Sequence, residues 1–185
     1  MITESFSAKV VAIHDRLDGA KIGHAFGGAL ALASYGEPRA TIDVDVNIFL
    51  DAGRHDQVVE ALSDLGVESN VPTDQVLRDG QCRLFWDVTP IDLFYAYHEL
   101  HAAMQKAARR APFRDTSVPI LAPEHLLTCK VIFNRPKDWL DIEQILVGAL
   151  DADRSEVADW LDRIVGADDP RAERFAELSR AFERN

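Results

Sequence analysis

The sharpest pattern of hydrophobic and polar positions in the chain lies between Thr41 and Leu50. Every even position from 42 to 50 is apolar, and every odd position from 41 to 47 is polar. Side chains of a strand point alternately to its two faces, so this period of two predicts a strand with one aliphatic and one polar face. Asp43 and Asp45 then leave the polar face side by side.

Helical spacing of apolar residues is the other recurring pattern. Residues 6–17 show it behind Ser5 or Thr3 as a cap, and Gly19 ends the predicted helix. The other predicted elements are a strand at 21–26, helices at 29–35 and 58–65, strands at 82–88 and 91–97 that meet near Thr89-Pro90, a short strand at 118–121, and helices at 124–133, 137–150, 155–165 and 170–182. Residues 67–80 are expected to be irregular, and the chain from 98 onward to be helical apart from 112–123.

This order of elements predicts an α+β fold, with a mixed sheet flanked by helices and then a helical part. A length of 185 residues suits one domain, or a core domain with a short extension. We therefore expect an α+β core at residues 1–100 and a mostly helical extension packed on it at 101–185. One continuous domain is the alternative.

Composition excludes several classes of protein. With 47% hydrophobic residues, the chain has enough apolar material for a core, which excludes a disordered chain. Cys82 and Cys129 are too few for a zinc site or a secreted disulfide scaffold. No apolar run approaches the roughly 18 residues of a membrane span, and residues 1–17 lack the apolar block of a signal peptide. We expect a cytoplasmic protein with no membrane partner.

Charge is distributed unevenly along the chain. The net charge of −11 argues against non-specific coating of nucleic acid, because polyanion binding depends on clustered Lys and Arg. Residues 105–137 nevertheless hold seven basic and two acidic side chains. Two interpretations stay open, namely helix faces that happen to be basic and a local wall that binds anions.

Three carboxylates are candidates for metal chemistry. Asp43 and Asp45 lie about 6.5–7 Å apart along the predicted strand and could share a hard divalent cation such as Mg²⁺. Alternatively, they only solvate an exposed strand face. Asp92 is a lone carboxylate in the otherwise apolar segment 90–95, where it needs a partner or a function. If its strand pairs beside 41–50, Asp92 completes a cluster of three carboxylates.

Further candidates are a glycine pair, an arginine and two histidines. Gly27-Gly28 lies between a predicted strand and a predicted helix, where backbone N–H groups could approach an anion. Taken alone, the pair is better explained as a simple tight turn. Arg39 would lie at the start of the strand, with an ordinary surface arginine as the alternative. His98 and His101 lack a third metal ligand and are interpreted as surface or packing residues.

In combination, these motifs resemble the DNA polymerase β-like nucleotidyltransferase superfamily. The residues that carry the resemblance are Phe26-Gly27-Gly28-Ala29, Arg39-Ala40-Thr41-Ile42-Asp43-Val44-Asp45 and the later Asp92. The Gly-Gly form, with glycine at position 28 where many members place serine, is similar to the small AbiEii-like toxin nucleotidyltransferases and their antibiotic-modifying relatives. Residues 122–130 and 135–142 look like the helical lysine motif and the Lys-Asp-x-x-Asp-Ile motif of that branch.

The resemblance implies a nucleotidyltransferase fold and transfer of a nucleotidyl group from a nucleoside triphosphate to an acceptor, with Mg²⁺, or alternatively Mn²⁺, as cofactor. It implies that Asp43, Asp45 and Asp92 are catalytic and bind the metal, with Asp92 binding a second ion or taking the acceptor's proton. It further implies a nucleotide-binding set of Gly27, Gly28, Arg39, Lys130 and Asp138. In that set Lys130 balances the phosphate charge, and Asp138 orients Lys130 or an acceptor group.

Several functions and acceptors stay open. The enzyme could be the toxin of a toxin–antitoxin pair, with an antitoxin protein as partner. A catalytically silent module of the same fold would bind nucleotide or a partner without turnover, and a metal-dependent phosphohydrolase could also display Asp-x-Asp. The acceptor could be tRNA or another RNA, a protein hydroxyl, or a small molecule such as an aminoglycoside. The basic residues 106–114 favour RNA, whereas the net charge favours a cationic small molecule.

Overall fold

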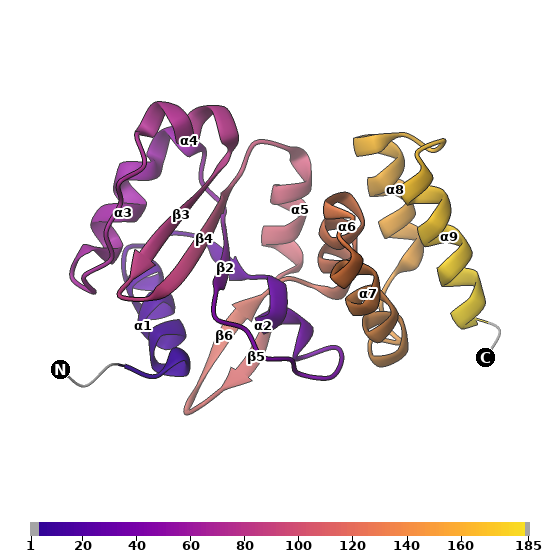
Figure 1. Cartoon of the computed structure of the whole chain (residues 1–185), viewed down its shortest axis with the longest axis horizontal. Helices are drawn as coiled ribbons and strands as arrows, with labels where there is room; N and C mark the ends of the chain where they lie inside the picture. The colour runs from indigo at the N-terminus through magenta and orange to yellow at the C-terminus, as the bar shows by residue number, and fades with distance from the viewer. Residues whose placement is uncertain (1–3, 184–185) are drawn as a thin grey trace. The chain divides into compact units, whose positions relative to one another are not determined.

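The computed structural model describes residues 4–183 and confirms the expected α+β class. Within this part of the chain, six strands form one mixed sheet in the order β3-β4-β2-β1-β6-β5 (Figure 1). The described residues divide into two compact units. Unit 1 comprises residues 4–30 and 40–121, and unit 2 comprises residues 31–39 and 122–183. Residues 101–121, which the sequence analysis assigned to the helical part, lie in unit 1.

Unit 1 holds the sheet and the helices between its strands. Ser5 caps the first helix by accepting the backbone N–H of Ala8, as predicted, while the alternative cap Thr3 lies outside the described residues. The elements of unit 1 are α1 (Phe6–Gly19), β1 (His24–Phe26), β2 (Val44–Ile48), η1 (Ala52–Arg54), α3 (His55–Ser63), α4 (Thr73–Asp79), β3 (Gln81–Trp86), β4 (Thr89–Tyr95), α5 (Glu99–Ala107), β5 (Arg109–Phe113) and β6 (Thr116–Ile120). The short α2 (Gly28–Leu32) starts in unit 1 and ends in unit 2.

The apolar face of the sheet is covered by α1 and α3. A hydrogen bond of 2.9 Å joins His14 Nδ1 on α1 to His24 Nε2 on β1, and one of 2.7 Å joins His55 Nδ1 on α3 to the Tyr95 hydroxyl on β4. All four side chains are buried. Because side chains alternate along a strand, the opposite face of β2 and β4 carries Asp45, Asn47 and Asp92, with Phe94 beside Asn47.

The central strand β2 is shorter than the alternating pattern predicted. It spans Val44–Ile48 instead of residues 41–50, and its apolar residues at positions 44, 46 and 48 are fully buried. Ile42 precedes the strand and is 78% exposed, so the expected aliphatic face does not extend to this residue. The helix predicted at 29–35 is also shorter, because the N–H groups of Tyr35 and Gly36 both bond the Leu32 carbonyl in a closing turn.

The pairing of strands around β2 decides which side chains meet. β4 runs parallel to β2 with Asp92 opposite Asp45, and β3 runs antiparallel to β4 with Arg83 opposite Asp92. Residues paired in this way project from the same face of the sheet. The condition for a three-carboxylate cluster, that the Asp92 strand pairs beside the Asp45 strand, is therefore met.

Two elements of unit 1 differ in kind from the sequence-based expectation. α4 lies within the segment 67–80 that was expected to be irregular; Pro72 precedes it, and Gly80 ends it with a left-handed φ of 63°. β5 forms where a helix was expected, and it pairs antiparallel with β6. Pro112 is tolerated in β5 because this strand lies at the edge of the sheet. The interpretation of residues 109–111 as a basic helix face is therefore wrong.

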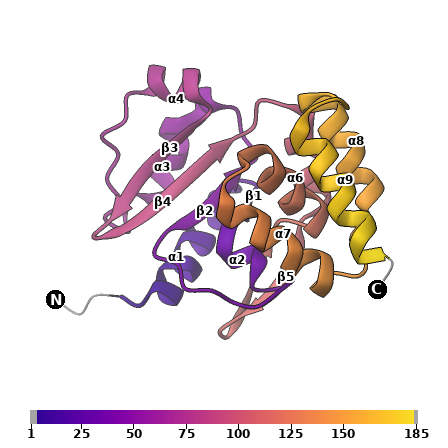
Figure 2. The ribbon, with the colours of Figure 1, turned by 45° about the vertical axis from the view of Figure 1, so that its right-hand side comes forward.

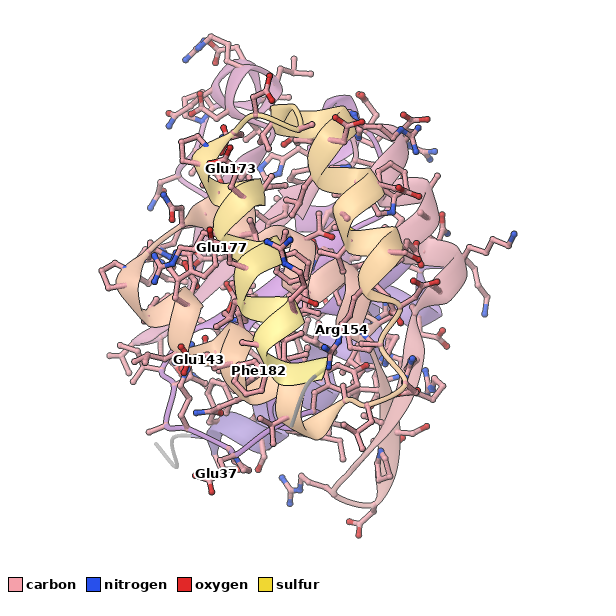
Figure 3. All side chains as sticks on the ribbon, turned by 90° about the vertical axis from the view of Figure 1, so that its right-hand side faces the viewer. Glu37, Glu143, Arg154, Glu173, Glu177 and Phe182 are labelled. Atoms are coloured by element: carbon pink, nitrogen blue, oxygen red, sulfur yellow. The ribbon has the colours of Figure 1, made fainter. Side chains whose placement is uncertain are left out.

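Unit 2 contains four helices after residue 122, namely α6 (Pro123–Phe133), α7 (Pro136–Gly148), α8 (Arg154–Val165) and α9 (Pro170–Glu183). α6 is the most buried of them because it packs against the other three (Figure 2). Arg154 on α8 (Figure 3) connects this helix to α9 and α7. Its guanidinium donates to the carbonyl oxygens of Ser179 at 3.0 Å and Leu146 at 3.2 Å. None of the helices within residues 4–183 has both the length and the apolar character needed to cross a membrane.

Candidate active site

The polar face of the sheet carries the carboxylates that the sequence singled out. Asp45 lies in β2, Asp92 lies opposite it in β4, and Asp43 directly precedes β2. The Thr41 hydroxyl donates a hydrogen bond to the Asp43 carboxylate, which holds this side chain at the start of the strand. The fold thus brings the three predicted acidic residues to adjacent positions in unit 1.

An arginine that the sequence analysis did not identify lies among these acids. Arg83 on β3 donates from Nε to Oδ1 of Asp92 at 2.6 Å and from Nη2 to Oδ2 at 2.7 Å. The hydrogen bonds and charge of Asp92 raise the pKa of Arg83, and the charges of Asp43 and Asp45 raise it further. The guanidinium therefore offsets part of the negative charge of all three carboxylates.

The turn between β3 and β4 explains why Arg83 was missed. The apolar pattern predicts this turn near Thr89-Pro90, which would set Arg83 opposite Ala96. The turn instead lies at Asp87-Val88, where Asp87 adopts a φ of 53°, and Arg83 consequently pairs with Asp92. Because the turn of a hairpin fixes its register, the position of the turn was the signal that could have found Arg83.

The Gly27-Gly28 turn packs directly against Asp45. The Gly27 N–H donates to the Asp45 carbonyl at 3.0 Å. Gly28 has a φ of +48°, and a Cβ at this position would lie 1.8 Å from Asp45 Oδ2. Glycine at position 28 is therefore required both by the backbone conformation and by the space that the carboxylate occupies. The following α2 has only five residues, so it adds little of the helix-terminus potential that the sequence suggested.

The donor chemistry of the three carboxylates fits a divalent cation. Mg²⁺ and Mn²⁺ prefer oxygen ligands, and Asp43 and Asp45 offer two carboxylates from alternate positions at one end of β2. Within residues 4–183, however, no three His, Cys, Asp or Glu side chains already stand in a metal-binding arrangement. Both oxygens of Asp92 bond Arg83. Each oxygen keeps a second lone pair for a metal, but the guanidinium charge beside Asp92 opposes the approach of another cation.

The other predicted nucleotide-binding residues, Arg39, Lys130 and Asp138, belong to unit 2, where they meet around Asp141. Lys130 Nζ lies 2.5 Å from Oδ2 of Asp141 and 3.8 Å from Oδ1 of Asp138. Arg39 contacts the two oxygens of Asp141 from Nε and Nη2 at 3.3 Å each. Lys130 is only 4% exposed and both aspartates are buried, so its charge is balanced within the protein. A contact of Lys130 with nucleotide stays a prediction.

Asp138 has a structural role at the start of α7. Its carboxylate accepts the backbone N–H of Arg135 at 3.1 Å and the Arg135 side chain at 2.7 and 3.1 Å. These bonds satisfy the N-terminus of the helix. Asp141 lies one helical turn further on and makes the shorter contact with Lys130, a partner that the sequence analysis did not single out.

The basic residues of segment 105–137 divide between the two units. In unit 1, Arg110 donates to the Ser117 hydroxyl at 3.1 Å and also to the Ser117 carbonyl. Its two terminal nitrogens each lie 3.5 Å from His14 Nε2. Arg110 therefore stabilises the β5–β6 hairpin and its contact with α1, which is a structural use of a residue considered above for RNA binding.

His98 and His101 are packing residues, which is the interpretation that the sequence favoured. His98 Nδ1 accepts the backbone N–H of Leu100 at 3.1 Å and caps α5. His101 is buried, with Nδ1 3.2 Å from the His98 carbonyl. Neither belongs to a metal-binding group of three side chains in the part of the chain that the structure describes.

Comparison with known proteins identifies the fold. No protein-family model matches the sequence, and no curated protein matches it significantly. Among solved structures, the solution structure of the antibiotic-resistance factor ANT(2″)-Ia aligns over 97% of each chain, with 15% identity and a TM-score of 0.61. Its crystal structure in complex with adenylyl-2″-tobramycin aligns over 96% of this chain and 97% of that chain, with 14% identity and a TM-score of 0.56.

A further solved structure shows the same likeness. The lincomycin-bound structure of the lincosamide antibiotic adenylyltransferase LnuA aligns over 75% of this chain and 94% of that chain, with 14% identity and a TM-score of 0.51. At these identities the likeness concerns the path of the backbone. The chain has the nucleotidyltransferase fold that the sequence resemblance implied.

Proposed function

We propose that this protein transfers a nucleotidyl group from a nucleoside triphosphate to an acceptor, with a divalent cation as cofactor: the acceptor bonds to the α-phosphorus as the bond to the β-phosphate oxygen breaks, and pyrophosphate leaves. The observation that carries the proposal is the pairing of β2 with β4, which sets Asp92 opposite Asp45. The Gly27-Gly28 turn, packed against the Asp45 carboxylate, supports it further. These features lie in a fold shared with nucleotidyltransferases.

Each residue of the site has a distinct role in this proposal. Asp43 and Asp45 would hold Mg²⁺ or Mn²⁺, and Asp92 would bind a second ion or accept the proton of the acceptor's attacking group. Bound ions would neutralise the triphosphate and stabilise the entering and leaving oxygens. Because the Gly27 N–H already bonds the Asp45 carbonyl, Gly28 is the candidate backbone donor to the phosphates.

A catalytically silent nucleotide-binding module is the alternative, and one observation favours it. Arg83 occupies both oxygens of Asp92, as it would in a protein that never uses this carboxylate for chemistry. Against this alternative, Asp92 faces Asp45 across two parallel strands, an arrangement that binding of a nucleotide alone does not require. The transfer activity is therefore the function that the site supports better.

For the acceptor, we favour a cationic small molecule of the antibiotic class. Of the two similar proteins described above, one is an antibiotic-resistance factor observed with adenylyl-2″-tobramycin, and the other is a lincosamide antibiotic adenylyltransferase observed with lincomycin. The net charge of −11 suits a positively charged acceptor and disfavours RNA. The structural use of Arg110 in its hairpin points the same way. A toxin role with an antitoxin partner stays a prediction from the sequence resemblance.

Ligand-dependent thermal stability tests the nucleotide part of the proposal without knowledge of the acceptor. A nucleoside triphosphate with Mg²⁺ should raise the Tm of the wild-type chain, because a ligand that binds only the folded state adds about 2.7 kcal/mol at 100-fold excess over its Kd. Asp45→Asn should lose the Mg²⁺-dependent part of the increase. Asp74→Asn, which alters an aspartate 75% exposed on α4, is the matched control and should keep it. If no triphosphate changes the wild-type Tm at millimolar concentration, the proposal is wrong.

A further inference from the structure

The Arg83–Asp92 ion pair lies beside Asp43 and Asp45, and these residues form the acidic face of the sheet. The positive charge of Arg83 competes there with any other cation. The guanidinium binds Asp92 at two points, at 2.6 and 2.7 Å. Arg83 is paired with Asp92 across β3 and β4, and Asp92 is paired with Asp45 across β4 and β2, so all three project from the same face of the sheet. Two parallel hydrogen bonds between an arginine and a carboxylate are among the strongest charged contacts at a protein surface. Arg83 thus serves as the counter-ion of the cluster when no other cation is bound.

The two partners differ in how easily they can move. Asp92 lies in the interior strand β4, between β3 and β2, and its side chain is 17% exposed. Arg83 lies in the edge strand β3, and its side chain is 52% exposed. The long arginine side chain can therefore rotate into solvent without a change in strand pairing. Asp92 stays in place while its partner is exchanged.

We propose that Arg83 is a replaceable counter-ion, which competes with a divalent cation for Asp92 and turns toward the triphosphate once it is displaced. The second half of this statement rests on the proposed function, whereas the first half does not. Without a triphosphate, the competition would keep the metal affinity low. When a triphosphate is bound, its phosphates offer the guanidinium another anionic partner, so Arg83 leaves Asp92 more readily and the metal affinity rises. Arg83 acts here as a positioning residue, since it controls the availability of Asp92.

Binding of Mn²⁺ alone to the full chain, measured by the electron paramagnetic resonance of the free ion, tests the competition. Arg83→Gln should bind Mn²⁺ roughly fivefold more tightly than the wild type, since a competing ion pair of about 1 kcal/mol is removed. Arg78→Gln is the matched control, because Arg78 forms an exposed pair with Asp74 on α4 and its loss changes net charge equally. This control should leave the Mn²⁺ affinity unchanged.

Two further variants make the result specific to Asp92. Arg83→Lys keeps the charge but loses the two-point contact, so its Mn²⁺ affinity should lie between those of the wild type and Arg83→Gln. In an Asp92→Asn background, Arg83→Gln should tighten Mn²⁺ binding clearly less than in the wild-type background, because only the longer-range effect of its charge on Asp43 and Asp45 is left. Circular dichroism of each variant checks that the fold is kept. If Arg83→Gln does not fold, the Mn²⁺ affinity of Arg83→Lys is compared with that of the wild type instead.

The outcomes separate this inference from the proposed function. Equal Mn²⁺ affinities of the wild type, Arg83→Gln and Arg83→Lys would overturn the inference, even if a triphosphate still raises the Tm. Equal tightening in Arg83→Gln and Arg78→Gln would also overturn it, because net charge alone would then explain the effect. Tighter binding only in the Arg83 variants would support it, even if no triphosphate binds and the proposed function fails.

Discussion

At the scale of single residues, Gly28 carries the tightest steric constraint of the candidate site. Its φ of +48° lies in the left-handed region, and an added Cβ would stand 1.8 Å from Asp45 Oδ2. Gly66 also has a left-handed φ, of +74°, but an added Cβ there would meet no atom within 4 Å. Substituting each glycine by alanine therefore distinguishes two contributions to the loss of stability. Gly66→Ala adds backbone strain only, whereas Gly28→Ala adds the same strain and also displaces a carboxylate.

We expect Gly28→Ala to be more damaging than Gly66→Ala. Each substitution strains a left-handed backbone by about 1–2 kcal/mol. Only Gly28→Ala also displaces Asp45, so it should lower the free energy of unfolding further and abolish the Mg²⁺-dependent increase in Tm caused by a triphosphate. Urea unfolding and thermal shift of both variants measure this difference. Equal nucleotide responses in the two variants would show that the Gly28 turn does not position Asp45.

The acidic residues could be predicted from sequence, but the contacts of Asp92 could not. Two aspartates on one side of an alternating strand, and a third in an apolar strand, are visible as local patterns. The pairing of Asp92 with Arg83 depends on where the hairpin turns, and a shift of a few residues changes every partner. Lys130 was likewise visible as part of a motif, whereas its burial between two aspartates depends on how α6 packs on α7.

At the scale of elements, the β3–β4 hairpin that carries Arg83 is anchored to α1 by a buried lysine. Lys9 is 1% exposed, and its ammonium donates to the Trp86 carbonyl at 2.8 Å, to Asp87 Oδ2 at 3.1 Å and to Thr89 Oγ1 at 3.1 Å. Trp86 and Thr89 flank the turn, and Asp87 lies in it. The contact thus holds the turn at the position that sets Arg83 opposite Asp92.

We expect Lys9→Met to lower the free energy of unfolding by about 2–3 kcal/mol, because three hydrogen bonds from a buried charged donor are lost. Lys106→Met, at an exposed position of α5, should change it by less than about 0.5 kcal/mol. Urea unfolding of both variants provides the comparison. A Lys9→Met variant as stable as Lys106→Met would contradict the anchoring role.

Elements with strong local signals were predictable, and those that depend on partners were not. α1 and α6 have clear caps or an opening proline, and both formed close to the predicted residues. β5 has two arginines and a proline within five residues, so its local preference is not that of a strand. It forms because β6 offers an antiparallel partner across the turn at Arg114.

At the scale of the whole molecule, buried histidines make stability depend on pH. Burial lowers the pKa of five of the six histidines, namely His14, His24, His55, His101 and His125. His14 illustrates the cause. Burial acts first, the nearby Arg110 lowers the pKa further, and Asp18 and Asp15 oppose the effect only in part. In the folded state these imidazoles therefore resist protonation.

The free energy of unfolding should consequently fall as the pH falls below about 6.5. Unfolded histidines take up protons near that pH, whereas the buried ones take them up only at lower pH, so acid favours the unfolded state. The stability contribution of neutral histidines is fully present above about pH 6.5 and is lost progressively below it. Urea unfolding between pH 7.5 and 5 measures the slope, and His14→Gln should reduce it. A constant or rising unfolding free energy on acidification would contradict this expectation.

Label transfer tests whether the site of Asp43, Asp45 and Asp92 transfers a nucleotidyl group. The full chain is incubated with Mg²⁺, each α-³²P-labelled nucleoside triphosphate, and tobramycin, lincomycin, tRNA or a small-molecule cell extract. We expect a small cationic acceptor to become labelled. Asp45→Asn should lower the rate at least about a hundredfold through loss of metal-assisted stabilisation, while Asp74→Asn should stay within about twofold of the wild type. No labelled product from any combination, or an Asp45→Asn variant as active as the wild type, would contradict it.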